Sequence, residues 1–341
     1  GRFCLSLIKE IKNIFPELKI TVLTSENSHQ PLEKNLIKPG FRGFFSNFFK
    51  IRQILKENDI IHALDGWPYG FVALAASYGL KKKIIITAIG SGAVAPLYSF
   101  WRKSLLTWAY KKAHRLTAIS HHTKKEILKI VPDIKIEVIN HGVDFQKFKI
   151  KNLKLKIAEN LKPYILGIGT LKKRKGYEYS LKAFAEISEK FPNLKYIIVG
   201  QGPEKENLKL KIKNLKLENR VIFLENLSEE ELIGLYHNAE LFILLPQDIN
   251  KDMEGFGLVF LEAAACGLPV VSSRDSSAED AVLEGKNGFL VSPQDFISAG
   301  EAMAQILADH NKREDFSKAS REFAQKMTWQ KAATEYAQLY S

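Results

Sequence analysis

The stretch that decides the fold reads Glu254-Gly-Phe-Gly-Leu-Val-Phe-Leu-Glu262, and its apolar character continues to Cys266. It places two carboxylates around two glycines. We predict a helix over residues 257–266, whose N-terminal amides form an anion site that a phosphate can approach closely at the glycines. Two carboxylates beside an anion site are explained if they accept hydrogen bonds from hydroxyl groups, one on a sugar and one on a ribose. The alternative is a buried helix with an acidic cap.

Strand and helix patterns alternate on both sides of this stretch. In the second half, the predicted strands are 164–169, 194–199, 221–224 and 241–245, and the helices between them are 177–191, 204–214 and 229–238. In the first half, the predicted strands are 18–24, 59–63, 83–88, 115–120 and 136–140. Such alternation predicts two Rossmann-like α/β domains with parallel sheets, facing across a cleft that holds ligand at the carboxyl ends of the strands.

The lysine-rich segment 146–162 is weakly patterned and is expected to link the two domains. We therefore place the domains at residues 1–152 and 153–329. Residues Arg321–Tyr340 show a helical apolar stripe with a break between two helices at Trp329, and we expect the second helix, 330–341, to pack back on the first domain. The chain opens with a helical pattern at Cys4–Phe15, so the first strand of that domain is expected to be missing.

The composition is that of a globular protein, with 45% hydrophobic and 26% charged residues. No apolar run reaches the roughly 18 residues that a membrane span needs. Cys4 and Cys266 lie far apart and form neither a disulfide framework nor a zinc motif, which favours a reduced, cytoplasmic protein.

The net charge of +12 is concentrated in the first half. Residues 1–152 carry 25 Lys and Arg against 11 Asp and Glu, a balance of +14, whereas the remainder carries 25 against 27, a balance of −2. An uneven balance of this kind indicates that only the first domain meets an anionic partner, either nucleic acid or an anionic membrane. The alternative is a solvated, lysine-rich surface.

The loop Gly167-Ile-Gly-Thr-Leu-Lys-Lys-Arg-Lys-Gly176 joins a strand to a helix and holds four consecutive cations. A transferase that expels a diphosphate must neutralise the charge that develops on the leaving group, and we assign that role to Lys175. The alternative is a solvated basic loop.

Five short motifs carry a resemblance that covers the whole second half. They are Gly169-Thr-Leu with Lys175-Gly176, Val199-Gly-Gln-Gly-Pro203, Glu254-Gly-Phe-Gly257 with Glu262, Ala265-Cys-Gly-Leu-Pro-Val270, and Gly288-Phe-Leu-Val291. In this order and spacing they resemble the family-4 retaining glycosyltransferases of the GT-B fold. In the first half the resemblance is weaker and rests on Ser120-His-His-Thr-Lys, Val138–Asp144 and Phe148.

The resemblance implies a role for each matching residue. Glu254 would accept hydrogen bonds from the hydroxyls of the donor sugar, Glu262 would bind the ribose and Lys175 the β-phosphate, while the base would lie near Leu227. The remaining donor-binding positions would be Gly169, Thr170, Arg174, Gly255, Phe256, Gly257 and Leu258. The family's usual chemistry further implies a UDP- or GDP-sugar donor, no metal, no cofactor, and a departing phosphate that helps deprotonate the acceptor on the same face of the sugar.

This sequence departs from the family pattern at three places. Thr170 stands where the family commonly has arginine, so that Lys172 or Arg174 would complete the diphosphate clamp. Thr87-Ala-Ile-Gly90 stands where a histidine often contacts the donor sugar. The glycine-rich loop of the first domain is represented only by Gly1. We assign Gly1 and His62 to the acceptor side, with a structural histidine as the alternative for His62.

The segment Phe41–Lys56 combines two aromatic stripes with cations. Phe45 and Phe49, beside Lys50 and Arg52, suit an anionic membrane or a lipid-linked acceptor. A wider buried face is the alternative.

Taken together, the sequence predicts a retaining, metal-independent transferase that moves a hexosyl group from a nucleotide sugar to a glycan, lipid-linked or small-molecule acceptor. It would work in the cytoplasm, on the membrane face. One alternative is a nucleotide-sugar epimerase of the same architecture. Another is a non-enzymatic binder of anionic surfaces or nucleic acid; since the chain lacks a recognition motif for nucleic acid, we expect no such partner.

Overall fold

The computed structural model describes residues 2–25, 33–37, 41–149 and 161–340, and the chain divides into two compact units. The first comprises Gly1–Asn140 with Trp329–Ser341, and the second comprises His141–Thr328. The second unit thus begins before the predicted boundary at residue 152. The reason is local packing: α7 (Phe145–Phe148) buries Phe148, whose ring lies 6.1 Å from that of Tyr236 and whose carbonyl accepts a hydrogen bond from the Cys266 thiol.

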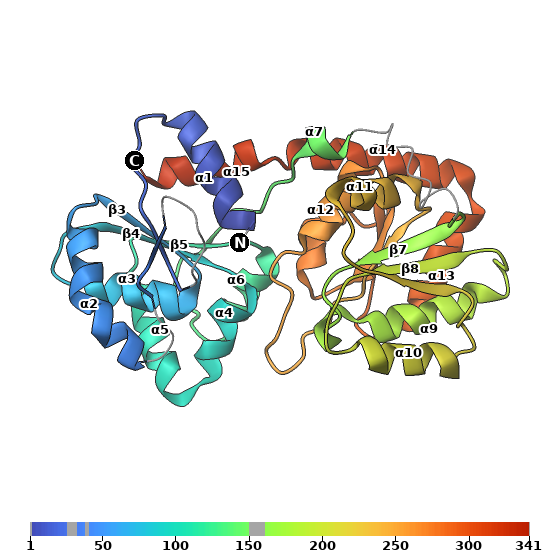
Figure 1. Ribbon diagram of the computed structural model, residues 1–341, viewed down its shortest axis with the longest axis horizontal. Coiled ribbons are helices and arrows are strands. Elements are labelled where there is room, and N and C mark those ends of the chain that lie inside the picture. The colour runs from blue at the N-terminus through green and yellow to red at the C-terminus, as the bar shows by residue number, and fades with distance from the viewer. Residues whose placement is uncertain (1, 26–32, 38–40, 150–160, 341) are drawn as a thin grey trace. The chain divides into compact units, whose positions relative to one another are not determined.

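The first unit is built on a four-stranded parallel sheet in the order β3-β4-β5-β6, with strands Ile60–Leu64, Lys83–Ala88, Arg115–Ala118 and Glu137–Val138. A separate parallel pair joins β1 (Val22–Thr24) to β2 (Glu33–Asn35), a strand that the sequence did not predict. The helical elements are α1 (Arg2–Ile14), α2 (Phe41–Lys56), η1 (Gly66–Gly70), α3 (Phe71–Ser77), α4 (Gly90–Val94), η2 (Ala95–Tyr98), α5 (Phe100–Lys112) and α6 (His121–Leu128). Helices α2, α3 and α5 pack in sequence along one side of this unit (Figure 1).

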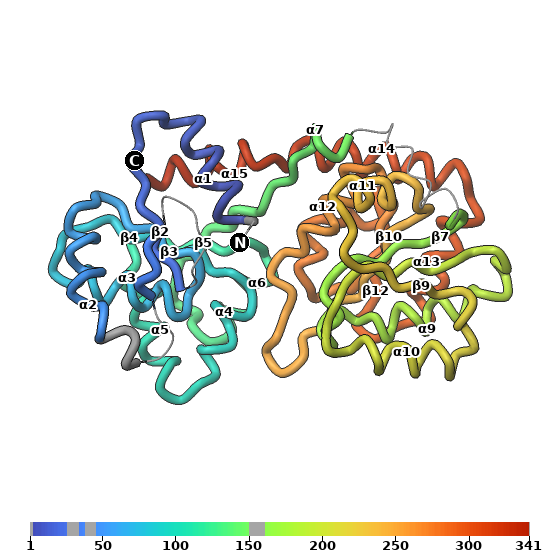
Figure 2. Tube along the Cα trace, in the orientation of Figure 1, coloured from blue at the N-terminus to red at the C-terminus, as the bar shows by residue number. Residues whose placement is uncertain are grey.

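The C-terminal helix α15 (Trp329–Tyr340) belongs to the first unit, although it follows the whole of the second in sequence. It lies beside α1, so that the blue and red ends of the chain run together in Figure 2. Their contact is apolar, with Leu7 and Ile11 from α1 packed on Ala333 and Tyr336 from α15. This pairing ties both ends of the described chain into one core.

The second unit contains a six-stranded parallel sheet in the order β12-β11-β10-β7-β8-β9. Its strands are β7 (Tyr164–Ile168), β8 (Lys195–Val199), β9 (Val221–Leu224), β10 (Phe242–Ile243), β11 (Val270–Ser273) and β12 (Gly288–Val291). Strands β8 and β9 extend the sheet on one side of β7. Strands β10, β11 and β12 then extend it on the other side. The order of the strands therefore reverses between β7 and β10, and ligands bind at such a point in open α/β sheets.

Helices cover both faces of this sheet (Figure 1). Helices α9 (Tyr177–Ser188), α10 (Lys205–Asn214) and α13 (Phe296–Ala308) pack together on one face. The other face carries α11 (Glu229–Asn238), α12 (Leu258–Ala265) and α14 (His310–Lys326). A parallel sheet covered in this way buries its strands completely, and every residue of β7 is buried. Among the described residues, no helix combines the length and the hydropathy that a membrane crossing requires.

Candidate functional site

The candidate site lies in the second unit, at the carboxyl edge of its sheet. The cationic loop leaves β7 and ends in the 3₁₀ turn η3 (Lys173–Lys175), while the chain leaving β10 leads to Glu254 and then to α12. Because β7 and β10 are neighbours and parallel, these two loops emerge side by side at the point where the strand order reverses. The topology thus brings the predicted cations to the predicted carboxylate.

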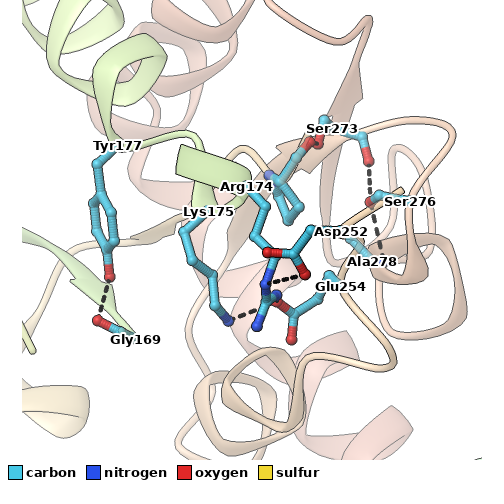
Figure 3. Close-up of polar contacts among 10 residues, drawn as sticks. Gly169, Arg174, Lys175, Tyr177, Asp252, Glu254, Ser273, Ser276 and Ala278 are labelled. Carbon is cyan, nitrogen blue, oxygen red and sulfur yellow. Dashed lines mark hydrogen bonds and ion pairs between the residues drawn. The ribbon is translucent and has the colours of Figure 1, made fainter. Parts of the chain in front are cut away.

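Two cations and two carboxylates meet between these loops (Figure 3). The Lys175 ammonium lies 2.7 Å from Glu254 Oε2, and the Arg174 guanidinium pairs with the same oxygen. Arg174 Nε also lies 3.2 Å from Asp252 Oδ1. Lys175 is 6% exposed and Glu254 is 8% exposed, so that this pair is shielded from water. With two charges of each sign, the cluster is neutral as it stands.

Glu254 remains ionised in this buried setting. Burial acts to raise the pKa of Glu254, but the charges of Lys175 and Arg174 and their hydrogen bonds lower it by more, so the pKa lies below its ordinary value. The group therefore accepts hydrogen bonds and does not donate a proton at neutral pH. This agrees with the predicted role of a hydroxyl acceptor and argues against a general acid.

Gly176 holds the cationic loop against the sheet. It has φ +68°, and a Cβ atom there would lie 1.7 Å from the carbonyl oxygen of Leu245. In addition, the Gln247 amide donates to the Arg174 carbonyl at 2.7 Å, and the Tyr177 hydroxyl donates to the Gly169 carbonyl at 3.1 Å. These contacts fix the backbone that carries Arg174 and Lys175.

Serine side chains hold the segment that leaves β10. Ser272 and Ser273, at the end of β11, donate to the carbonyls of Leu244 and Pro246 at 2.8 and 2.5 Å. Ser276 donates to the Ser273 carbonyl at 2.8 Å and accepts from the Ala278 amide, as Figure 3 shows. The start of the loop that leads to Glu254 is therefore fastened to the neighbouring strand.

Helix α12 begins one residue later than predicted, at Leu258, and its N-cap residue is Gly257 with φ +75°. No side chain caps this end, although the Phe260 amide donates to the Gly257 carbonyl at 2.9 Å; an anion site here stays a prediction. Phe256 is buried, with its ring 5.1 Å from that of His141, and Gly255 and Leu258 are partly exposed. Burial lowers the pKa of His141 to about 3, so this imidazole is neutral beside the loop.

The remaining predicted donor residues lie in varied settings. Glu262 is 6% exposed and accepts a hydrogen bond of 2.9 Å from the Tyr236 hydroxyl. Leu227 follows β9 at the same carboxyl edge and is partly exposed. Thr170 is exposed, and Gly169, with φ +152°, lies at the end of β7. All of these residues except Glu262, which lies in α12, are in loops that leave the carboxyl ends of strands.

The acceptor-side assignment of His62 is not supported by its surroundings. Its Nδ1 lies 2.8 Å from the Tyr340 hydroxyl and its Nε2 lies 2.7 Å from the Thr87 hydroxyl. Both ring nitrogens are thus engaged inside the first unit, and burial lowers the pKa of His62 to about 4. This favours the structural alternative. Gly1 lies outside the described residues.

Asp65, which the sequence did not single out, occupies the carboxyl edge of the first sheet. It follows β3 directly and has φ +117°, which is rare for a side chain that is not glycine. Its Oδ1 accepts from the Gly66 amide at 2.7 Å and from the Ile89 amide at 3.4 Å. Burial raises the pKa of Asp65 to about 7, although both hydrogen bonds act to lower it. The signal in the sequence was an acidic residue directly after an apolar strand and before a glycine.

A cavity of about 350 Å³ lies elsewhere in the second unit and is lined by His237, Glu240, Gly267, Arg313 and Arg321 among others. Glu240 precedes β10 and Gly267 precedes β11, so this cavity is at the amino edge of the sheet. No predicted donor residue lines it. We therefore do not place the donor there.

Comparison with known proteins agrees with this geometry. Residues 149–323 match the family model described as Glycosyl transferases group 1, and residues 15–147 match the one described as Glycosyltransferase Family 4. A GDP-mannose-dependent alpha-(1-6)-phosphatidylinositol monomannoside mannosyltransferase from Mycolicibacterium smegmatis is 28% identical over 66% of this chain. Sulfoquinovosyl transferase SQD2 from Arabidopsis thaliana is 28% identical over 81% of this chain. The chain spans 62% and 55% of the lengths of these two relatives.

Among solved structures, Anabaena Alr3699/HepE in complex with UDP is similar with a TM-score of 0.84. The match covers 99% of this chain and 95% of that one at 21% sequence identity. At this level of identity the similarity shows that the two chains share a fold. The fold is GT-B, as the motifs implied. With a family model that matches about half of the chain, this protein belongs to the glycosyl transferases group 1 family.

Proposed function

We propose that this glycosyltransferase binds a nucleotide sugar at the carboxyl edge of its second unit, with the diphosphate between Lys175 and the N-terminus of α12. The observation that carries the proposal is the pairing of both Arg174 and Lys175 with the buried Glu254. A UDP- or GDP-sugar is the donor class. This fits two similar proteins, one of which is named as GDP-mannose-dependent and the other of which was solved in complex with UDP.

The charges suggest how the donor enters. The four-residue cluster is neutral, so an incoming diphosphate would need to take cations from the carboxylates. Lys175 and Arg174 would then face the phosphates, and Glu254 would exchange its cations for the hydroxyls of the donor sugar. The cations and the carboxylate already lie at the site before the ligand arrives, and they exchange partners when the donor binds, before the transfer step.

For the chemistry we propose retention at the anomeric carbon without a metal ion or another cofactor. Lys175, and the exposed Lys172 and Lys173 of the same loop, would stabilise the departing diphosphate, while its oxygen accepts the proton of the acceptor. The acceptor would be a glycan, a lipid-linked saccharide or a small molecule, bound by the basic first unit on the cytoplasmic membrane face. No nucleic acid is part of this proposal.

The experiment compares Glu254→Gln and Lys175→Met with the wild-type protein. We expect kcat/KM for sugar transfer to fall at least about 100-fold in both, because each removes a charge or an acceptor aimed at the reacting group. Donors are first chosen by thermal stabilisation with a panel of nucleotide sugars. Transfer is then measured as nucleotide release that depends on an acceptor, and the anomeric configuration of the product is assigned by nuclear magnetic resonance.

Each single change leaves a buried partner without its countercharge, which destabilises the fold. The double variant Glu254→Gln/Lys175→Met removes both charges of the pair and therefore serves as the control for misfolding. Exposed Glu218 offers the matched control, and Glu218→Gln should transfer at the wild-type rate. Full activity in Glu254→Gln and Lys175→Met would refute the proposal. An epimerised nucleotide sugar formed from the donor alone would point instead to an epimerase.

A further inference from the structure

The beginning of α5 presents aromatic side chains to solvent. Phe100 is 99% exposed, and Tyr98 and Trp101 are 46% and 42% exposed. Single exposed apolar residues are ordinary, but three within four positions place a continuous aromatic patch at the surface, of the kind that marks an interaction site. We call this patch, with the neighbouring Trp67, Arg102 and Lys103, the α5 surface.

The rings of the α5 surface are held by one another. Trp67 stacks on Phe71 with 5.4 Å between centroids, and Trp101 meets Trp67 edge to face, also at 5.4 Å. The Arg102 guanidinium lies 4.9 Å from the Trp101 ring centroid and 5.6 Å from that of Trp67. The arrangement keeps aromatic and cationic groups together at the surface, where Phe100 extends beyond them without a cover.

The charge around this surface has one sign. From Gly66 to Lys125 the sequence contains no Asp or Glu, whereas it contains ten Lys and Arg, namely Lys81, Lys82, Lys83, Arg102, Lys103, Lys111, Lys112, Arg115, Lys124 and Lys125. Arg102 and Lys103 are exposed, and neither pairs with a carboxylate among the described residues. The partner of the α5 surface should therefore be anionic.

We propose that the α5 surface docks on an anionic lipid membrane, with Phe100 inserted among the acyl chains and Arg102 and Lys103 at the headgroups. Aromatic side chains beside cations are typical of a helix at the membrane interface. A single-stranded nucleic acid would need open ring faces for its bases, but Trp67 is stacked on Phe71 and Trp101 carries Arg102. A second copy of this chain would bring the same positive charge and be repelled.

The position of the α5 surface connects membrane docking with the acceptor. This connection rests on the proposed function. Trp67 lies in η1, directly after the carboxyl end of β3, and α5 follows β4 by way of α4 and η2. The surface thus lies toward the carboxyl edge of the first sheet, where open α/β domains bind their ligands. An acceptor carried by a membrane lipid would reach that edge directly. We infer that the acceptor is lipid-linked.

The test is flotation of the purified protein with vesicles of phosphatidylcholine alone or mixed with phosphatidylglycerol. We expect binding only to the mixed vesicles and its loss at high salt. Phe100→Ser should weaken it about tenfold, because a phenyl group no longer inserts. Arg102→Gln/Lys103→Gln should weaken it by at least about tenfold. The controls lie in the second unit: Leu210→Ser removes a side chain that is 58% exposed, and Lys318→Gln/Lys326→Gln removes two exposed lysines of α14.

The same assay on Phe49→Ser distinguishes the α5 surface from α2, where Phe49 is 82% exposed. The proposal is overturned if Phe100→Ser floats like the wild-type protein, or if only Phe49→Ser loses binding. It is also overturned if Phe100 mediates self-association without lipid, as light scattering would show. Flotation needs no donor, and nucleotide binding is measured without vesicles, so failure here and failure of the proposed transfer are seen separately.

Discussion

Two carboxylates, the buried Glu254 and the partly exposed Asp65, have opposite electrostatic settings. Glu254 shares one oxygen with two cations, and these hold its pKa down against the effect of burial. Within the part of the chain that the structure describes, Asp65 accepts hydrogen bonds from two backbone amides, which do not outweigh the effect of burial, and its pKa is raised to about 7. Each carboxylate lies at the carboxyl edge of its own sheet. The first is suited to accept hydrogen bonds, and the second changes its charge near neutral pH.

The pKa of Asp65 makes a prediction at the residue scale. Between about pH 4 and pH 7 the folded protein keeps the proton of Asp65 and the unfolded chain has lost it, so the wild-type protein loses stability as the pH rises. Asp65→Asn removes this dependence. We therefore expect its free energy of unfolding to match that of the wild-type protein near pH 4 and to exceed it above pH 7, the difference growing by up to about 1.4 kcal/mol per pH unit.

Chemical denaturation at a series of pH values measures this difference. Asp133→Asn, an exposed aspartate of the same unit, controls for the loss of one charge. Parallel stability curves for the Asp65→Asn and wild-type proteins would show that the carboxyl group is not perturbed.

At the scale of elements, the turn between β7 and α9 depends on Gly176. Gly176 and Gly285 have nearly the same φ, +68° and +69°. A Cβ at Gly176 would meet the Leu245 carbonyl, whereas a Cβ at Gly285 would have no neighbour within 4 Å. An alanine at either position strains the left-handed backbone, but only an alanine at Gly176 also clashes with the neighbouring loop. Comparing the two variants therefore separates these two effects.

We expect Gly285→Ala to cost about 1–2 kcal/mol of stability, which is the left-handed strain alone. Gly176→Ala should cost this and about 1–3 kcal/mol more, because the loop must move away from β10. It should also weaken nucleotide binding, since Arg174 and Lys175 move with the loop. Thermal unfolding and nucleotide titration check both effects. Equal losses of stability in the two variants would contradict the role assigned to the Leu245 contact.

On the scale of the whole molecule, each unit has its own core, and α15 completes the first one. Tyr336 is fully buried against α1, in a cluster that includes Leu7, Ile11 and Ile139. The helix that completes the first unit thus follows the whole of the second unit in the sequence. The second unit contains all residues of the candidate donor site.

Tyr336→Ala should therefore destabilise the first unit by about 3–5 kcal/mol and leave nucleotide binding by the second unit nearly unchanged. Hydrogen exchange is the measurement, with faster exchange expected in α1 and β3–β6 and little change in β7–β12. Thr334→Ala, on the exposed side of α15, is the control. Faster exchange spread evenly through both units would contradict the division into two cores.

Much of the architecture followed from local patterns. The bounds of β4, β9 and α11 are those that the sequence predicted, and the break before Trp329 was confirmed. Apolar runs and helical stripes arise from side-chain spacing along a single element, which the sequence displays directly. Turns and short strands were less predictable: β2 was missed, and the helical stretch after β3 is divided into η1 and α3, which ends at Ser77, before Gly79 with φ +77°.

By itself the sequence determined the glycosyltransferase family, its GT-B fold and the two α/β units, and it predicted which loop residues bind the donor, because motifs and periodicity are properties of neighbouring residues. Only the tertiary structure decided that Arg174 pairs with Glu254, 80 residues away, that His62 has both nitrogens engaged, and that Phe100 is left in solvent. Burial and pairing depend on which strands become neighbours. That choice is made by the packing of the whole sheet, which no local pattern records.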